Sequence, residues 1–318
     1  MNTHPNRTLA TRTLVLGSDY TGEINSRMGV AEWLEGEISQ VSLATAEEVV
    51  NGSTHPELLG YDLLIAGTGE DSTRLALDLA SKIGNPLTVF VASILPDELD
   101  PNIQRYDLVV APPHPELSGD HVLQILGVPS RLQPNPTPPQ PVSSSPRMAL
   151  LLGGNTRYCE GFTEDYAQRL ANRLLNQAQL WNGKFVISNS RRTPEGSLHA
   201  LRKVLSPVEE TFIDWKQGDS HRYKKLLEEA EVIFCTGDSL SMCSEAAMQG
   251  KPLLVTCDEE AMEIYHIRTL QRMVREGHAH FFEEPMEHIP DPVSVLNTTE
   301  VIGLKITELL KSRKQANS

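Results

Sequence analysis

The sequence predicts an α/β protein with two parallel sheets, each covered by helices on both faces. Short apolar runs alternate with amphipathic segments along the whole chain, which is typical of buried parallel strands and the helices that connect them. Polar turns follow several of these apolar runs. A proline-rich segment divides the 318 residues almost in half, and each half is long enough for one domain of about 150 residues.

The first half contains four expected strands and two expected helices. The helix over 25–35 has Met28, Val30, Ala31 and Leu34 as its apolar set, a spacing that places them on one face. We expect the residues before it, 17–23, to form a polar loop. The expected strands are 13–16, 61–66, 87–92 and 108–111, and the second helix is 72–83.

The second half repeats the alternation of strand and helix. Its apolar strands are continuous, as expected for strands that are buried on both faces. We expect the last helix to fray at its end, SRKQANS. The expected strands are 148–152, 184–188, 210–214, 232–235 and 253–256. The expected helices are 164–179, 195–205, 223–229 and 298–311, with a further helix that follows the turn 236–239 and ends at Gly250.

The clearest domain boundary is the segment 132–146. Its six prolines and three consecutive serines exclude a helix or a central strand, so we expect a stiff, partly extended linker. The division predicts an N-terminal Rossmann-like domain at 1–131 and a C-terminal one at 147–318. Two such domains facing across a cleft resemble the GT-B architecture of many glycosyltransferases, an analogy of fold rather than of chemistry.

Composition excludes several classes of function. The net charge of −14 argues against a nucleic-acid partner, although it leaves a local basic patch open. The four cysteines have neither CxxC nor His/Cys metal spacing, and buried reduced thiols are the simplest interpretation. The chain has no apolar run long enough for a membrane span, and because the segment MNTHPNRTLATRT has no apolar stretch we expect it not to be a secretory signal. We therefore expect a cytoplasmic protein without metal or cofactor, and leave peripheral contact with a membrane open.

The stretch 233–252 is the most informative, because it reads as a strand, a polar turn, a helix and a new strand. Ligands of open α/β sheets bind outside the carboxyl ends of the strands, where helix amino ends hold anions. Glu245 lies one turn after Ser241 and could accept both hydroxyls of a ribose. Helix capping by Asp238 or Ser239 is a compatible alternative. The candidate nucleotide-binding residues here are Thr236, Asp238, Ser239, Ser241 and Glu245.

Two further turns follow expected strands of the second half. Glycines after strand 148–152 would let the backbone approach a phosphate closely, and a plain tight turn is the alternative. The arginines after strand 184–188 have the planar fork that suits a phosphate or carboxylate. The candidate binding residues of these turns are Gly153, Gly154, Asn155, Ser190, Arg191 and Arg192.

The first half offers candidates for a general base at the same edge of its sheet. Asp19 and Glu23 lie in the expected loop 17–23, and His114 follows strand 108–111. The alternative for each is a solvated loop side chain. No GxSxG, HExxH, Walker or GxGxxG motif occurs, which removes most support for hydrolase, zinc-protease, NTPase and dinucleotide functions.

Several of these motifs together resemble the elongated-mitochondria (mitochondrial fission factor) family, which is grouped with GT-B-type proteins. The segments that resemble it are GGNT, SRRTP, TGDSLSMCSEA and GKP, and in the first half RYDLV and the Pro113-His114 pair. The first half also departs from the family pattern. Glu23 stands where the family usually has His, Ser26 where it has Gln, and Pro115 where Asp follows the histidine.

The leading functional hypothesis is metal-independent transfer of a sugar from a nucleotide sugar, in cell-envelope or other glycoconjugate synthesis. The second half would hold the nucleotide, and Arg191 or Arg192 would neutralise the leaving diphosphate. Asp19, Glu23 or His114 would deprotonate an unidentified acceptor. A non-catalytic scaffold or regulator is the first alternative, supported by the departures in the first half. Epimerisation of a nucleotide sugar, with Asp19 or Glu23 acting together with Glu245, is the second.

Overall fold

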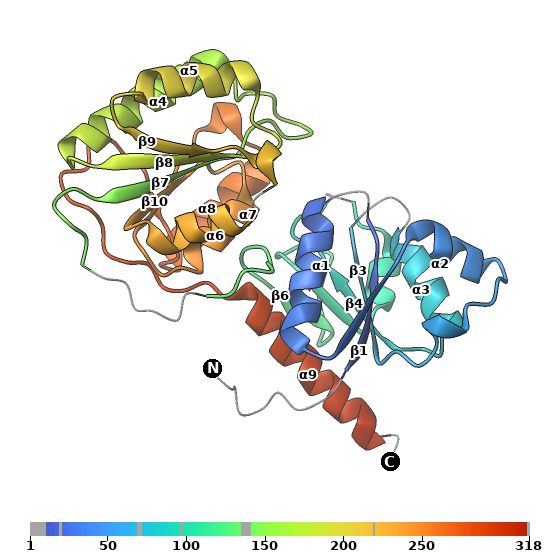
Figure 1. Ribbon diagram of the computed structural model, residues 1–318. Coiled ribbons are helices and arrows are strands. Elements are labelled where there is room, and N and C mark those ends of the chain that lie inside the picture. The colour runs from blue at the N-terminus through green and yellow to red at the C-terminus, as the bar shows by residue number, and fades with distance from the viewer. Residues whose placement is uncertain are drawn as a thin grey trace. The chain divides into compact units, whose positions relative to one another are not determined.

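The computed structural model describes residues 11–18, 21–68, 72–95, 98–134, 141–218 and 220–316. The chain forms two compact units (Figure 1): unit 1 is Met1–Arg131 with Asn297–Ser318, and unit 2 is Leu132–Leu296. Each unit has a six-stranded sheet in which the described strand pairs are parallel. Helices cover both faces of each sheet. The predicted α/β class with two Rossmann-like units is confirmed.

The sheet of unit 1 has the order β2-β1-β3-β4-β5-β6. β1 pairs with β2 on one side and with β3 on the other, so the direction of winding reverses between β1 and β3. In doubly wound sheets, ligands bind outside the strand ends at such a reversal. The strands are β1 Arg12–Leu16, β2 Glu37–Val41, β3 Leu63–Gly67, β4 Leu87–Val91, β5 Leu108–Ala111 and β6 Val122–Gln124.

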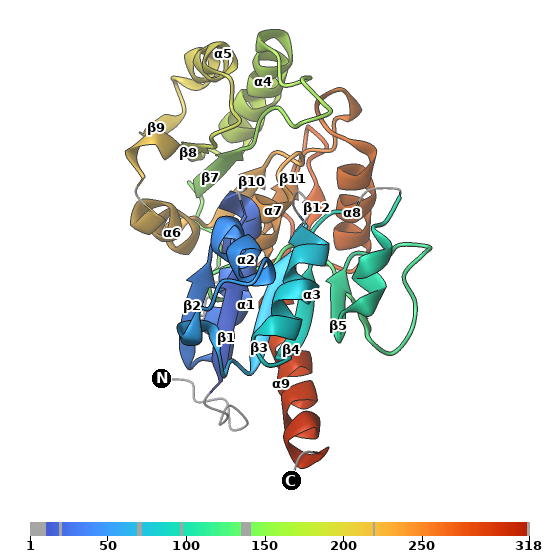
Figure 2. The ribbon, with the colours of Figure 1, turned by 90° about the vertical axis from the view of Figure 1, so that its right-hand side faces the viewer.

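Two pairs of helices bury the two faces of this sheet. Strand residues alternate between the faces, so Leu14 and Leu16 pack with α2 and α3, while Val15 packs with α1 and α9. Figure 2 shows α2 and α3 in front of the strands of unit 1. The helices are α1 Thr21–Leu34, α2 Leu43–Val50, α3 Ser72–Lys82 and α9 Thr298–Ala316, with short 3₁₀ turns at Pro56–Leu58 and Pro101–Arg105.

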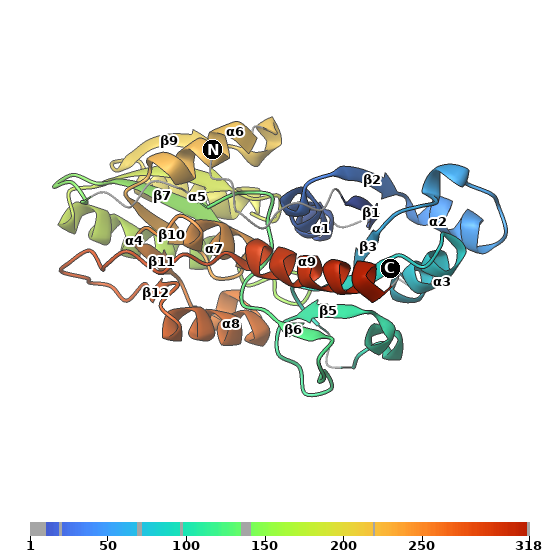
Figure 3. The ribbon, with the colours of Figure 1, turned by 90° about the horizontal axis from the view of Figure 1, so that it is seen from below.

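The C-terminal helix α9 departs from the expected division at 147–318, because it belongs to unit 1. It runs beside α1 (Figure 3), and its residues Ile302, Ile306 and Leu310 complete the core on that face of the sheet. A Cβ on Gly303 would lie 2.0 Å from the ring of Trp33. This helix fills apolar surface that α1 leaves uncovered.

Helix α1 begins at Thr21 rather than at Asn25, so Glu23 lies in its first turn and not in a loop. A negative side chain in the first turn suits the helix dipole. This correction matters for the site, because it places Glu23 one helical turn before Arg27. Asp19 lies outside the described residues.

The sheet of unit 2 has the order β12-β11-β10-β7-β8-β9. β7 pairs with both β10 and β8, so the reversal lies between β7 and β10. Both strands are followed by turns that the sequence singled out. The strands are β7 Arg147–Leu152, β8 Lys184–Asn189, β9 Glu209–Ile213, β10 Val232–Cys235, β11 Leu253–Val255 and β12 His280–Phe281.

Five helices cover the sheet of unit 2 in the described residues. Figure 1 shows α4 and α5 over one face and α6, α7 and α8 below the other. On the α4 and α5 side, strand residues such as Leu150 and Phe234 pack against Leu170 and Leu201. The helices are α4 Glu164–Leu180, α5 Glu195–Leu205, α6 Ser220–Glu229, α7 Leu240–Ala247 and α8 Ile264–Arg275, with 3₁₀ turns at Trp215–Gln217 and Glu259–Ala261.

The described parts of the proline-rich segment, 132–134 and 141–146, form no helix or strand. The backbone N–H of Ser143 donates to the carboxylate of Glu231 over 2.7 Å, and the hydroxyl of Ser145 donates to the carbonyl of Asn182 over 2.7 Å. The end of the predicted linker is therefore held on unit 2.

Candidate functional site

The turns after β7 and β10 are joined by hydrogen bonds at the reversal of the unit 2 sheet. The N–H of Gly153 donates to the hydroxyl of Thr236 over 2.8 Å, and the N–H of Gly154 donates to Oδ2 of Asp238 over 2.7 Å. Thr236 and Asp238 are both buried. The two predicted motifs therefore form one structure.

The two glycines are required by contacts within the protein. A Cβ on Gly153 would lie 2.0 Å from Oδ2 of Asp238. Gly154 has φ +148°, and a Cβ there would lie 2.1 Å from the carbonyl oxygen of Arg192. Real Cβ atoms do not approach so closely, so both positions need glycine whether or not a phosphate binds. The sequence predicted a close approach, and the structure shows that protein groups make it.

Arg192, in the turn after β8, makes hydrogen bonds to the turns after β7 and β10 and so holds the three turns of the site together. Its Nη1 donates to the carbonyls of Gly154 and Asn155, each over 3.0 Å, and its Nη2 donates to the carbonyl of Asp238 over 3.2 Å. Nη1 also lies 3.1 Å from Oδ2 of Asp238. Arg191, its neighbour, is exposed. The arginine pair thus divides into one residue that holds the loops and one at the surface.

Ser190 and Asn155 add to this bracing. The hydroxyl of Ser190 donates to the carbonyl of Gly153 over 2.7 Å and accepts from the N–H of Arg192 over 3.2 Å. The N–H of Asn155 donates to the carbonyl of Arg192 over 3.1 Å, and its side-chain oxygen accepts from the N–H of Phe162 over 3.0 Å. These side chains fix the shape of the loops, and their contact with a ligand stays a prediction.

Asp238 is the buried charge at the centre of the site. Burial raises the pKa of its carboxyl group. The charge of Arg192, the N–H of Gly154 and the hydroxyl of Thr236 oppose this rise because they stabilise the ionised form. A buried carboxylate held by an arginine and a backbone N–H makes the site rigid and polar.

Helix α7 carries the remaining predicted residues. Ser239 is its N-cap and is buried, but its side chain makes no capping hydrogen bond. Ser241 is exposed and Glu245 half-buried, on one helix face. The phenol of Tyr223 donates to Oε2 of Glu245 over 2.9 Å, and burial followed by the charge of Glu245 raises the pKa of that tyrosine. Tyr223, a residue of α6, therefore holds the carboxylate of Glu245 in position.

The first turn of α8 also belongs to this site, although the sequence analysis did not predict that helix. Thr156 donates to Glu263, the N-cap of α8. The N–H of Glu263 donates in turn to Nδ1 of His266 over 3.3 Å. Burial, and then the charge of Arg192, lowers the pKa of His266 to about 4. The same arginine also acts on Tyr265, so this turn lies close to the braced loops.

In unit 1, Glu23 lies in the first turn of α1 and Arg27 lies one turn later. The guanidinium of Arg27 contacts the ends of β1 and β3. Nη1 of Arg27 donates to the carbonyls of Leu16 and Gly17 over 2.7 and 3.0 Å, and Nη2 donates to the carbonyl of Thr68 over 2.7 Å. Arg27 is fully buried. Burial raises the pKa of Glu23, against the smaller effects of the Thr68 hydroxyl and the charge of Arg27.

His114 lies at the same sheet edge but is not brought to Glu23. It follows β5, and strands β3 and β4 separate β5 from β1, which corresponds to about 14 Å between strand ends. Nδ1 of His114 accepts from the N–H of Glu116 over 3.2 Å, so the ring is engaged in a local turn. Glu23 and His114 therefore lie apart on this edge, and the role of either as a base stays a prediction.

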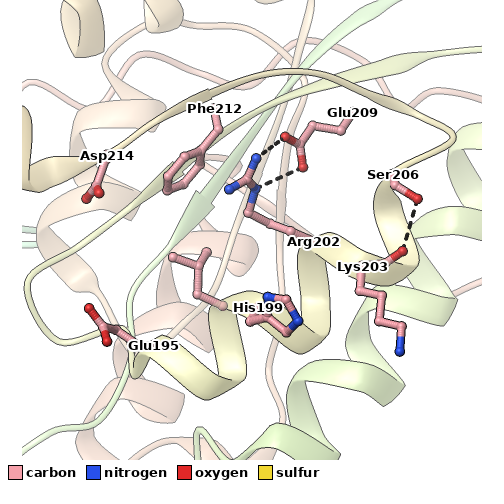
Figure 4. A pocket seen from close by; sticks show the side chains of 9 residues that line it. Glu195, His199, Arg202, Lys203, Ser206, Glu209, Phe212 and Asp214 are labelled. Atoms are coloured by element: carbon pink, nitrogen blue, oxygen red, sulfur yellow. Dashed lines mark hydrogen bonds and ion pairs between the residues drawn. The ribbon is translucent and has the colours of Figure 1, made fainter.

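A separate surface pocket of about 780 Å³ lies between α5 and the edge strand β9 (Figure 4). Arg202 pairs there with Glu209, Nε to Oε2 over 3.0 Å, and its guanidinium lies 4.1 Å from the centre of the Phe212 ring. The guanidinium of Arg202 and the carboxylate of Glu209 are therefore partners of each other in this pocket. None of the candidate residues predicted from the sequence lines it.

Two further features of the described part of the chain concern metal ligands and membrane-spanning helices. No three His, Cys, Asp or Glu side chains there are grouped as metal ligands. Among those same residues, no helix has the length and apolar character needed to cross a bilayer. The cytoplasmic location stays a prediction.

Comparison with known proteins identifies the family. The family model for mitochondrial fission ELM1 matches residues 8–310. The chain belongs to the mitochondrial fission ELM1 family. This ELM1-family chain is 29% identical over 180 residues to "Uncharacterized protein RP120" of Rickettsia prowazekii (strain Madrid E), a match that covers 53% of the chain and 47% of that protein. The match thus spans about half the length of that relative.

The solved structures that resemble the chain are distant from it in sequence. The UDP-GlcNAc 2-epimerase from Methanocaldococcus jannaschii matches the ELM1-family chain with a TM-score of 0.55 and 13% identity, over 93% of this chain and 99% of that one. Acinetobacter baumannii MurG matches with a TM-score of 0.49 and 13% identity, over 94% and 90%. At this identity the epimerase likeness concerns the fold alone. The ELM1-family chain has the GT-B-type α/β fold that the sequence predicted.

Proposed function

We propose that this ELM1-family chain transfers a sugar from a nucleotide sugar to an acceptor hydroxyl. The observation that carries the proposal is the braced polar site at the reversal of the unit 2 sheet, where Asp238 and Arg192 fix three loops beside the amino end of α7. In folds of this class the reversal is the expected ligand position. The fold shared with a UDP-GlcNAc 2-epimerase supports a nucleotide sugar as the ligand.

Unit 2 would hold the donor. The N–H groups at the start of α7, next to Ser239, and the exposed Arg191 would take the diphosphate, because both favour negative charge. Glu245, positioned by Tyr223, would accept the ribose hydroxyls. Arg192 would act by holding the loops in place. In this scheme the positive charge that stabilises the leaving diphosphate comes from Arg191 and the helix N–H groups.

Unit 1 would supply the base. Glu23 is the favoured candidate, since burial raises the pKa of its carboxyl group and Arg27 fixes its surroundings. It would take the acceptor proton as the acceptor oxygen bonds to the sugar carbon. The bond from that carbon to the diphosphate oxygen would break, and the diphosphate would leave with the bonding electrons.

Epimerisation of a nucleotide sugar is the second candidate, favoured by the match to the epimerase at a TM-score of 0.55. It would use the same nucleotide site. The product distinguishes the two reactions, because epimerisation changes the sugar with no acceptor present. A non-catalytic scaffold would tolerate Arg191→Ala without losing its activity in the cell, whereas an enzyme would not.

The test is thermal unfolding of the protein against a panel of nucleotides and nucleotide sugars. A ligand at 100 times its dissociation constant adds about 2.7 kcal/mol to the free energy of unfolding. We expect a nucleotide diphosphate to raise the midpoint of wild type and of Arg74→Ala, a control at an exposed arginine on α3, but much less in Arg191→Ala. If no nucleotide in the panel stabilises the folded wild type, the donor site is refuted.

A further inference from the structure

Two buried polar atoms on α1 have no hydrogen-bond partner among the described residues. They are Nε of Arg27 and Oε2 of Glu23. The two residues are four apart on the helix, so their side chains leave the same face on successive turns. A buried polar atom without a hydrogen bond lowers the stability of the fold, so these two atoms need an explanation.

The guanidinium of Arg27 is fixed in one orientation. Nη1 and Nη2 are used by carbonyls at the ends of β1 and β3, at Leu16, Gly17 and Thr68. A Cβ on Gly67 would lie 3.0 Å from Nε and 3.2 Å from Nη2, so glycine leaves the space that this guanidinium needs. These contacts use three of the five N–H groups of Arg27, and Nε is the nitrogen of this side chain without a hydrogen bond among the described residues.

The carboxyl group of Glu23 faces a similar environment. Its neighbours include the hydroxyl of Thr68 and the charge of Arg27, both of which favour the ionised form. Its Oε2 nevertheless accepts no hydrogen bond from the described residues. The first two turns of α1 thus carry one nitrogen and one oxygen that lack hydrogen bonds among the described residues, at the reversal of the unit 1 sheet.

A group that both donates and accepts hydrogen bonds could pair with each of these atoms. A hydroxyl donates its proton to a carboxylate oxygen and accepts from an N–H through a lone pair. A ketone could accept but not donate, an ammonium could donate but not accept, and a phosphate would be repelled by Glu23. The donor and acceptor on α1 therefore match an alcohol.

We propose that Glu23 and Arg27 bind the hydroxyl of a sugar or polyol acceptor. This inference rests on the proposed transfer reaction and names its acceptor class. Glu23 accepts the hydroxyl proton, and Nε–H of Arg27 holds the oxygen with a lone pair free to attack. Since both atoms are out of contact with solvent, neighbouring side chains must move for the ligand to enter, and the bound hydroxyl is then shielded from water.

The test follows the Nε–Hε signal of Arg27 by ¹⁵N NMR in the full chain, assigned by its loss in Arg27→Lys. Glycerol, methyl glucoside and N-acetylglucosamine are the probes, added without nucleotide. We expect at least one of them to shift this signal in wild type and in Glu116→Gln, a control at an exposed carboxylate after β5. Glu23→Ala should lose the response.

Two results would overturn the inference. The first is an Arg27 signal that none of the three probes moves in the folded wild type. The second is a crystal structure in which one ordered water bridges Nε and Oε2 and stays there in crystals soaked with the probes. Nucleotide stabilisation without an Arg27 response refutes the acceptor site alone. An Arg27 response without nucleotide stabilisation refutes the donor site alone.

Discussion

The carboxylate of Asp238 and the backbone N–H of Gly154 share a 2.7 Å hydrogen bond between the ends of β10 and β7. These strands are neighbours in the sheet, at the point where its winding reverses. The bond, with the ion pair to Arg192, makes the loops one rigid body. A ligand at this edge would meet a surface formed in advance, which lowers the entropy that binding costs.

Gly154→Ala should strongly destabilise unit 2. The backbone there has φ +148°, and the new Cβ would lie 2.1 Å from a carbonyl oxygen that cannot move without displacing the Arg192 loop. Gly52→Ala is the matched control, since Gly52 has φ +109° but no atom within 4 Å of the added Cβ. We expect Gly52→Ala to lower the free energy of unfolding by about 1 kcal/mol and Gly154→Ala to lower it clearly more, as measured by urea unfolding. Equal losses would contradict the packing explanation.

Removing the Asp238 carboxylate should cost about 3 kcal/mol or more in the free energy of unfolding. Asp238→Ala leaves the N–H of Gly154 and the guanidinium of Arg192 without their central acceptor. Asp238→Asn keeps an oxygen that can accept from Gly154 and should lose less. Denaturant unfolding of both variants checks the order. If Asp238→Asn lost as much free energy of unfolding as Asp238→Ala, the charge of Asp238 would contribute more to stability than its hydrogen bond to Gly154.

Much of the unit 2 site could be predicted from its sequence, because its motifs follow continuous apolar strands. Gly153, Arg192 and Asp238 were placed at strand ends, and these turns do meet. Their hydrogen bonds to one another could not be predicted, because they depend on which strands are neighbours. The order β10-β7-β8 is a tertiary property that periodicity does not contain.

Some of the elements that were missed lack a strong local pattern. β2 is half exposed, so its residues do not form an apolar run. α8, which carries His266 into the site, does have such a pattern, because its buried residues Ile267, Leu270 and Met273 recur every three residues, and this spacing could have predicted it. The start of α1 at Thr21 was not predicted, because the first turn of this helix contains polar residues and a glycine, which are typical of loops. Packing of α9 on unit 1 depends on contacts with Trp33, far away in the sequence.

His266 should make the protein sensitive to mild acid. Its pKa is about 4 in the folded chain, against 6.5 ordinarily, because burial and Arg192 disfavour the charged ring. As the pH falls, the unfolded chain therefore binds a proton at His266 before the folded chain does. Stability falls between pH 6.5 and about pH 4, and His266 causes no further change in stability at pH values outside this range. The loss should reach about 3 kcal/mol.

The measurement is the free energy of unfolding against pH for wild type, His266→Asn and His199→Asn. Asparagine at 266 can still accept from the N–H of Glu263 but does not titrate in this range. We expect the acid loss to shrink in His266→Asn and to persist in His199→Asn, where the ring is exposed. An unchanged loss in His266→Asn would contradict the assignment.

Glu23→Gln should stabilise unit 1 at neutral pH, even though it removes the proposed base. Burial raises the pKa of Glu23, so the folded chain binds its proton more readily than the unfolded chain does. The ionised carboxylate therefore lowers stability as the pH rises from the ordinary glutamate value through the raised one. Glutamine carries no charge and has no such loss of stability. The free energy of unfolding of Glu23→Gln should therefore exceed that of wild type by an amount that grows with pH across this range and then levels off.

The check is the difference in unfolding free energy between Glu23→Gln and wild type, measured from about pH 4 to pH 8. Glu116→Gln exchanges an exposed carboxylate of the same unit for an amide, and its difference from wild type should vary little. Sugar transfer by Glu23→Gln should fall together with this gain in stability, because the buried carboxylate that costs stability is the proposed base. A variant that is stabilised and fully active would exclude Glu23 as the base.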